Sequence, residues 1–170
     1  MPAIHVTPLS RLHETVDASG AGHVVTLINA STAVERPASI APDRHLFVGV
    51  SDITASMDGH ILPAEDHVER LLRFVKDWDR SRPMVIHCWA GISRSTAAAF
   101  ITVCSLRPER NEAIVARALR EASPSATPNP RLIAVADAML GRDGRMIDAI
   151  ADIGRGADAF EGVPFRLPVD

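Results

Sequence analysis

The sequence has 170 residues, of which 46% are hydrophobic, and its formal net charge is −3 at pH 7. The length predicts one domain with a substantial core, and the composition is that of a globular protein rather than a disordered chain. The small negative charge gives no general attraction to nucleic acid or to an acidic membrane, so neither is expected as a partner. No stretch approaches the ~20 apolar residues that span a bilayer, and the first residues do not read as a signal peptide.

The elements predicted for the first third of the chain are short strands separated by a helix and loops. Leu9, Leu12 and Val16 are spaced as one apolar face of a helix that stops at Gly20. In chain order, we expect a strand at 4–7, a helix beginning at 8–10, a strand at 23–29, a loop at 32–42 and a strand at 45–50. The β-branched run at 23–29 is typical of a strand that is buried on both faces.

Helices dominate the rest of the predicted elements. The apolar residues from Val68 to Trp78 recur at helical spacing, and Pro63 is a suitable first position for that helix. The further expectations are a strand at 84–86 and helices at 96–106, 109–122, 131–140 (capped by Gly141) and 144–153 (with Met146, Ile147, Ile150 and Ile153 on one side). Residues 154–170 form a tail in which Val163, Phe165 and Leu167 alternate, so it either lies extended or frays.

Strands that alternate with helices predict an α/β fold with a mainly parallel sheet of about four to five strands, covered by helices on both faces. No repeat or linker divides the chain, so residues 1–170 are expected to form a single domain. Ligands of such sheets bind beyond the carboxyl ends of the strands. Asp52 and Cys88 each follow a predicted strand, which would bring them to the same edge of the sheet.

Residues 85–96 read V-I-H-C-W-A-G-I-S-R-S-T and run from a strand through a tight loop into a helix. With Gly91 in the loop, backbone N–H groups and a helix N-terminus would form an anion site. Positive potential at this place favours the thiolate of Cys88. The planar guanidinium of Arg94 matches two oxygens of a phosphate.

This stretch contains H-C-x-x-G-x-x-R-[S/T], here from His87 to Ser95, and resembles the signature loop of the protein tyrosine phosphatase superfamily. The G-I-S-R-S ending is most similar to the dual-specificity branch. The resemblance is strong over 85–96, loose elsewhere in a core of about 23–140, and does not extend to the tail after Gly154. It implies the cysteine-phosphatase fold and a reaction that needs neither a metal nor a cofactor.

The resemblance also implies roles for the loop residues. Cys88 would attack phosphorus and form a phosphocysteine intermediate, while Ser95 would donate its hydroxyl toward the Cys88 sulfur. His87 would tune the nucleophile through hydrogen bonding. The phosphate oxygens would be held by the Arg94 side chain and by the backbone of Trp89, Ala90, Gly91, Ile92, Ser93 and Arg94. Without the resemblance, Ser95 is a helix-start hydroxyl, His87 a core residue and Trp89 a packing residue.

A general acid must come from outside the loop. Asp52, at the end of the third predicted strand, is the first choice because the dual-specificity pattern has an acid there, and Asp58 in the following loop is the alternative. Either would also suit a turn or a helix cap. Asn129 resembles the Pro-Asn of many dual-specificity phosphatases and is expected to brace the active-site loop. Val135 stands where that family often has a water-positioning glutamine.

The expected function is hydrolysis of phosphate monoesters, with a phosphorylated protein or a small phosphate ester as the partner and phosphate-like anions bound in the loop. The alternatives are a rhodanese-like sulfurtransferase and a non-catalytic phosphate-binding module, although such modules commonly lose the cysteine or the arginine. No lysine occupies the variable loop positions, which disfavours a polyphosphorylated inositide. Because only Cys88 and Cys104 are present, no disulfide framework is expected, and the cytoplasm is the expected location.

Overall fold

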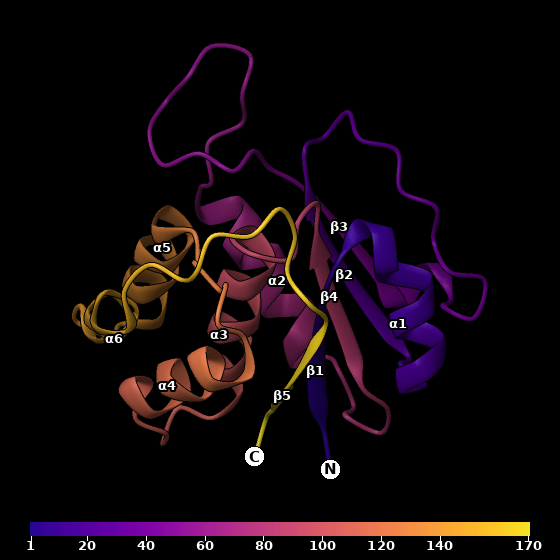
Figure 1. Cartoon of the computed structure of the whole chain (residues 1–170). Helices are drawn as coiled ribbons and strands as arrows, with labels where there is room; N and C mark the ends of the chain where they lie inside the picture. The colour runs from indigo at the N-terminus through magenta and orange to yellow at the C-terminus, as the bar shows by residue number, and fades with distance from the viewer.

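The computed structural model describes residues 1–170, which are built around a five-stranded sheet with the strand order β3-β2-β4-β1-β5 (Figure 1). The strands are β1 (Ala3–Pro8), β2 (His23–Ile28), β3 (His45–Gly49), β4 (Met84–Cys88) and β5 (Phe165–Pro168). The first four run parallel, and β5 pairs antiparallel with β1 at one edge. The predicted mainly parallel sheet is confirmed.

Helices cover both faces of the sheet, also as predicted. The 3₁₀ turn η1 (Leu9–Arg11) and α1 (Leu12–Ser19) lie on one face, and 3₁₀ turn η2 (Pro42–Arg44) precedes β3. The other face carries α2 (Glu65–Lys76), α3 (Arg94–Leu106), α4 (Glu112–Ala122), α5 (Pro130–Leu140) and α6 (Arg145–Ile153). Side chains of the strands alternate accordingly, since Val24 and Val85 pack with α1 while Val25 and Ile86 join the larger core.

Helix α3 is the central helix of the larger core. Its side chains from Arg94 to Cys104 are all buried, because it packs on the sheet on one side and against α2, α4 and α5 on the others. Phe100 is fully buried there, and burial of such a side chain contributes about 2 to 3 kcal/mol. The beginning of α3, and with it the loop before the helix, is therefore held in place by the core.

Several helix boundaries differ from the sequence predictions: α1 begins at Leu12, after the η1 turn, and α3 begins at Arg94 rather than at residue 96. Helix α2 begins at Glu65 rather than Pro63, because the His67 ring accepts a hydrogen bond from the Ala64 N–H (3.0 Å) and caps the helix there. Trp78 lies beyond the end of α2, buried, and donates from Nε1 to a backbone oxygen. Helix α4 begins at Glu112 instead of Glu109, because the Asn111 side chain caps it.

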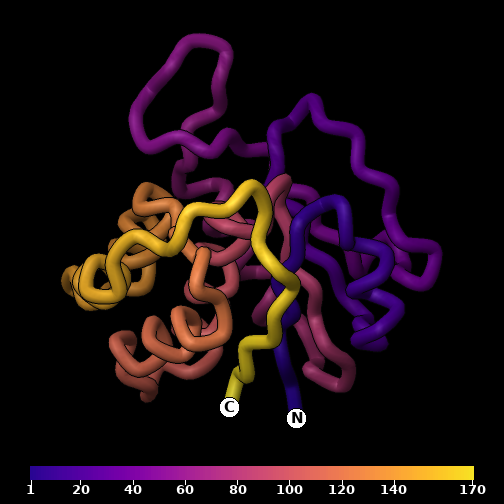
Figure 2. Tube along the Cα trace, viewed as in Figure 1, coloured from indigo at the N-terminus to yellow at the C-terminus, as the bar shows by residue number.

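In the C-terminal region, the structure differs from the predicted apolar face of α6 at one residue and shows which of the two conformations expected for the tail is present. Ile147 is 43% exposed and does not belong to the apolar face of α6, whose buried residues are Met146 and Ala149. The tail lies extended rather than frayed. Figure 2 shows it leaving α6, crossing in front of the helices and reaching the sheet, where β5 covers the outer edge of β1.

The parallel strands bring four chain segments to one end of the sheet. Pro8, Asn29, Val50 and Cys88 stand at or just after the carboxyl ends of β1, β2, β3 and β4. The residues predicted to carry the chemistry follow two of these strands, as the topology requires. None of the helices has both the length and the apolar character needed to cross a lipid bilayer.

Candidate active site

The loop between β4 and α3 makes a turn that only glycine permits at its centre. Gly91 has a φ of +70°, a region that side chains strongly disfavour. In addition, a Cβ on Gly91 would lie 2.8 Å from the backbone nitrogen of Pro8, at the end of β1. The loop is therefore pressed against the carboxyl end of the neighbouring strand, which determines where Cys88 and Arg94 stand.

Cys88, the expected nucleophile, is buried at the start of this loop with two hydrogen-bonding groups around its sulfur. The Gly91 N–H donates to Sγ over 3.2 Å, and Ser95 Oγ lies 3.1 Å from Sγ. Ser95 belongs to the first turn of α3, whose N-terminal end carries a partial positive charge. A thiolate at Cys88 would accept hydrogen bonds from both groups, which are placed to stabilise negative charge.

Arg94 is buried, and one edge of its guanidinium is already bound by the protein. Nη1 donates to Asn29 Oδ1 (2.8 Å) and to the Val50 carbonyl oxygen (2.9 Å). Nε is also buried but has no partner. An unpaired buried N–H of a charged group is costly, so this edge of Arg94 suits an anion that accepts from Nε and Nη2 together.

The outward-facing carbonyl groups of the loop explain why its N–H groups face inward. Donors outside the loop bind four of these oxygens: Leu9 N to Trp89 O (3.0 Å), Gly162 N to Ala90 O (2.7 Å), Thr127 N to Ile92 O (2.9 Å) and Asn129 N to Ser93 O (3.2 Å). Because a peptide unit is planar and trans, a carbonyl held outward turns the following N–H toward the centre of the loop. The result is a preorganised ring of donors for an oxyanion.

His87 is completely buried, and its two ring nitrogens bind the Cys88 carbonyl oxygen and the Thr26 hydroxyl rather than the Cys88 sulfur. Its Nδ1 lies 3.1 Å from the Cys88 carbonyl oxygen, so Nδ1 carries the proton and donates. Nε2 then accepts from Thr26 Oγ1 (2.7 Å), which in turn accepts from His45 Nε2 (2.8 Å). Burial lowers the pKa of His87 to about 4, which keeps the ring neutral and this chain of hydrogen bonds intact at neutral pH.

This burial makes stability depend on pH in a defined window. Since the pKa of His87 is lowered from 6.5 to about 4, the unfolded state binds more protons between these values, and stability falls as the pH falls through them. From pH 7 to 4.5, we expect the wild type to lose about 2 to 3 kcal/mol more unfolding free energy than His87→Gln. Urea unfolding of both proteins at the two pH values measures this, and equal losses would contradict it.

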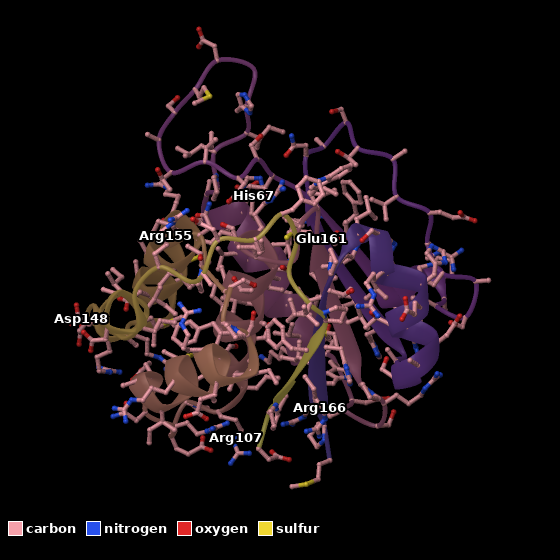
Figure 3. The ribbon with its side chains drawn as sticks, in the orientation of Figure 1. His67, Arg107, Asp148, Arg155, Glu161 and Arg166 are labelled. Atoms are coloured by element: carbon pink, nitrogen blue, oxygen red, sulfur yellow. The ribbon has the colours of Figure 1, made fainter.

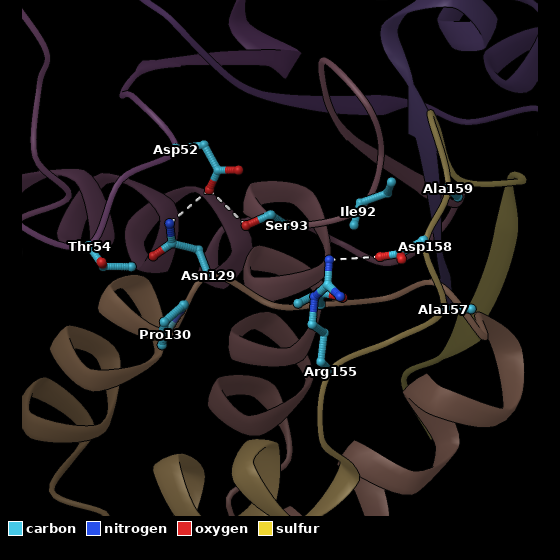
Figure 4. Close-up of a pocket in the computed structure, with 11 residues that line it drawn as sticks. Asp52, Thr54, Ile92, Ser93, Asn129, Pro130, Arg155, Ala157, Asp158 and Ala159 are labelled. Atoms are coloured by element: carbon cyan, nitrogen blue, oxygen red, sulfur yellow. Dashed lines mark hydrogen bonds and ion pairs between the residues drawn. The ribbon is translucent and has the colours of Figure 1, made fainter.

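Asp52 is held against the loop by two partners. Its Oδ1 accepts from Ser93 Oγ (2.7 Å) and from Asn129 Nδ2 (2.8 Å), which leaves Oδ2 without a protein partner (Figure 4). Asn129 Oδ1 meanwhile accepts from the first N–H groups of α5 and caps that helix. Asp58 lies exposed in the loop that projects from the body between β3 and α2. The geometry thus places Asp52, and not Asp58, beside the loop.

A cavity of about 340 Å³ opens beside the loop on its Ile92–Ser93 side and does not include Cys88. The lining residues come from the loop, the Asp52 and Asn129 segments and the tail: Asp52, Thr54, Ile92, Ser93, Thr127, Asn129, Pro130, Arg155, Ala157, Asp158 and Ala159. Arg155 is the one basic side chain among them, and it pairs with Asp158 at 2.7 Å. The cavity therefore lies between Asp52, the loop and the tail.

The structure therefore brings the residues predicted from the sequence to one loop, where each occupies a different position. Cys88, Ser95, Arg94 and Asp52 surround one loop, Asn129 bridges Asp52 to α5, and Trp89 is 55% exposed at the rim. No group of three or more His, Cys, Asp or Glu side chains is arranged to hold a metal ion.

Two contributions were missing from the sequence reasoning. Asn29 orients Arg94, and its position directly after a buried strand, at the carboxyl edge of the sheet, was a usable signal. The tail residues 155–159 form a wall of the cavity, and Gly162 binds the loop. Nothing in the spacing of the tail residues pointed to the loop.

Comparisons with known proteins agree with this fold and with the loop motif. A family model described as protein-tyrosine phosphatase matches residues 58–124, which include the whole loop but neither Asp52 nor the tail. A comparison with curated proteins gives no match.

Similar solved structures include DUSP15 (TM-score 0.66, 16% identity, 89% of this chain and 92% of that chain) and a phosphatase of Cydia pomonella, PTP-2 (0.62, 20%, 79% and 84%). Human DUSP28 is also similar (0.61, 18%, 82% and 94%). These likenesses show a shared fold. The chain is thus similar to protein-tyrosine phosphatases over residues 58–124, including the loop, and it has the fold of the dual-specificity structures.

Proposed function

We propose that this protein hydrolyses phosphate monoesters through a phosphocysteine intermediate on Cys88, without a metal. The observation that carries the proposal is the convergence of three groups on one cradle. The Gly91 N–H and the Ser95 hydroxyl lie beside the Cys88 sulfur, while Nε of Arg94 is buried without a partner. A dianionic phosphoryl group can accept from the free edge of Arg94, while the other two donors stabilise the sulfur that attacks it.

In the first step, the Cys88 thiolate attacks phosphorus in line, a sulfur–phosphorus bond forms and the ester oxygen–phosphorus bond breaks. The leaving oxygen takes a proton from Asp52, whose free Oδ2 belongs to the same cavity that would receive the leaving group. Arg94 and the inward-facing N–H groups stabilise the charge on the three equatorial oxygens.

In the second step, water attacks the phosphocysteine and inorganic phosphate leaves. Asp52, now a carboxylate, accepts a proton from that water. Cys88 departs as a thiolate, and the Ser95 hydroxyl 3.1 Å from the sulfur donates to it as the charge develops.

The substrate class is supported by the charges around the cavity. Arg155 is its one cation, and Asp158 already neutralises it, so a second or third phosphate would find no free positive partner there. We therefore favour a singly phosphorylated substrate, either a phosphorylated side chain of a protein or a small phosphate ester.

The first experiment follows p-nitrophenyl phosphate hydrolysis by the reduced protein in the presence of EDTA. Turnover is expected, iodoacetate is expected to abolish it, and inorganic phosphate is expected to protect. Burial raises the pKa of Cys104 to about 12, so alkylation reports on Cys88. Phosphate protection without turnover would instead favour a binding module, and sulfur transfer from thiosulfate would favour a sulfurtransferase.

Asp52→Asn tests the general acid. Asparagine keeps an oxygen for Ser93 and a similar shape, but it cannot donate a carboxyl proton. We expect about a 10²-fold lower kcat on phenyl phosphate, a smaller loss on p-nitrophenyl phosphate, whose leaving group needs less protonation, and loss of the alkaline limb of the pH profile. The matched control is Asp58→Asn, which is expected to retain wild-type rates. A larger defect in the control would transfer the role to Asp58.

A further inference from the structure

The segment 154–162, which precedes β5, is fastened to the two loops that form the candidate active site. Near its start, the N–H groups of Gly156 and Ala157 donate to Thr127 Oγ1 (3.1 Å) and to the Pro124 carbonyl oxygen (2.9 Å). At its end, the Gly162 N–H donates to the Ala90 carbonyl oxygen (2.7 Å). The segment is thus bound at both ends, although it has no helix or strand of its own.

Glu161 connects the segment to the residues that follow β1, on the other side of the loop. It lies where the tail reaches the upper end of the sheet (Figure 3), and its carboxylate accepts from Ser10 Oγ at 2.8 Å. Ser10 follows Leu9, whose N–H binds the neighbouring Trp89 carbonyl oxygen. The tail and the start of the chain therefore hold adjacent peptide units of the active-site loop.

Close contact between backbones makes glycine necessary at both ends of the segment. A Cβ on Gly162 would lie 2.8 Å from the Gly91 carbonyl oxygen, and one on Gly156 would lie 2.6 Å from the Ser125 and Ala126 carbonyl oxygens. Such distances require the backbone to move. The close packing of the segment therefore depends on Gly156 and Gly162, because a side chain at either position would push the segment away from the loop that it contacts.

The contact at Gly162 reaches the nucleophile through a single peptide unit. The Ala90–Gly91 peptide has its carbonyl bound by Gly162 and its N–H directed at the Cys88 sulfur (3.2 Å). Because the two groups point in opposite directions from a rigid plane, the outward bond fixes the direction of the inward one. Released from Gly162, this peptide is free to rotate its N–H away from Cys88.

We propose that the segment 154–162 is part of the active site and that Gly162 is a positioning residue, which holds the Gly91 N–H on the Cys88 sulfur. The inference rests on the proposed function only in taking Cys88 as the nucleophile. It extends the site beyond the signature loop to a segment about 70 residues further along the chain.

The test is Gly162→Ala, with the pH dependence of iodoacetamide alkylation of Cys88 as the first readout. Loss of a hydrogen bond to a charged sulfur is expected to slow alkylation at pH 6 by about tenfold and to move its midpoint to higher pH. The acid limb of kcat/KM should move in the same direction. Thermal unfolding and circular dichroism establish that the variant is folded, and general destabilisation alone would not displace the midpoint.

Two further variants make the outcome decisive. Val163→Ala changes the next residue, which is 77% exposed, and is expected to alkylate and turn over as the wild type does. Gly156→Ala loosens the other end of the segment. It should raise the midpoint pH of Cys88 alkylation less than Gly162→Ala does, because Gly156 does not bind the Ala90–Gly91 peptide. If Gly162→Ala does not fold, Gly156→Ala decides by the same readout.

A folded variant with a wild-type midpoint would overturn the positioning role. The alkylation readout is independent of turnover, so the result stands even if the wild type hydrolyses no phosphate ester. In that case the proposed function fails while the effect of Gly162 on Cys88 is still measured.

Discussion

Arg94→Lys is expected to lower kcat on p-nitrophenyl phosphate by about 10²- to 10³-fold, with a smaller change in KM. Lysine retains the positive charge, so electrostatic attraction of the dianion persists. It cannot, however, bind Asn29 and Val50 through one nitrogen and present two further N–H groups in the same plane to the phosphoryl oxygens. The geometry needed in the transition state is lost, although ground-state attraction is kept.

The matched control is Arg82→Lys. Arg82 also donates to two backbone oxygens, those of Gly20 and Ala21, but at the opposite end of the sheet, before β2 begins. Its replacement should leave both kinetic constants unchanged. If Arg94→Lys turned over as fast as the wild type, charge alone would suffice, and the free guanidinium edge would not be the phosphate clamp.

Cys88→Ser should abolish turnover, with kcat reduced by at least about 10⁴-fold. A serine hydroxyl at this position has no neighbouring base to deprotonate it, because its neighbours would be a backbone N–H and another neutral hydroxyl. The N–H groups of the loop remain in place, so tungstate or phosphate should still raise the thermal unfolding temperature. Steady-state rates and thermal shifts measure the two effects separately.

The control for this variant is Cys104→Ala. Cys104 is buried in α3 and packs in the core, so alanine there lowers stability but should spare kcat. Residual activity of Cys88→Ser that matched the wild type would contradict a cysteine nucleophile. Equal inactivation of both variants would show that unfolding, rather than chemistry, explains the loss.

The sequence was sufficient for the elements that depend on local pattern. Apolar spacing identified α2 and α3, and the β-branched run at 23–29 identified β2, because these residues must bury one or both faces wherever they lie. Two helix starts were predicted wrongly, because the caps at Ala64 and Asn111 depend on the orientation of one side chain.

Contacts between distant segments account for what the sequence did not predict in the site. The loop motif sufficed to identify Cys88 and Arg94, because their chemistry depends on residues within eight positions of each other. Asn29 and Gly162 reach the loop only through the fold. Asn29 accepts a hydrogen bond from Arg94, and the Gly162 backbone N–H donates to the Ala90 carbonyl oxygen. A glycine in an irregular tail does not reveal which carbonyl oxygen its N–H binds, so only the three-dimensional arrangement identifies the contact.

The distance between Cys88 and Cys104 determines how the protein responds to peroxides. The Cys88 sulfur lies beside Ser95, in the first turn of α3, and Cys104 is nine residues beyond Ser95, roughly 14 Å along the helix. A disulfide requires Cα atoms within about 7 Å, so an oxidised Cys88 finds no resolving cysteine in its own chain. A sulfenic acid formed there must be capped by a neighbouring backbone nitrogen or by glutathione, or else it proceeds to the irreversible sulfinic acid.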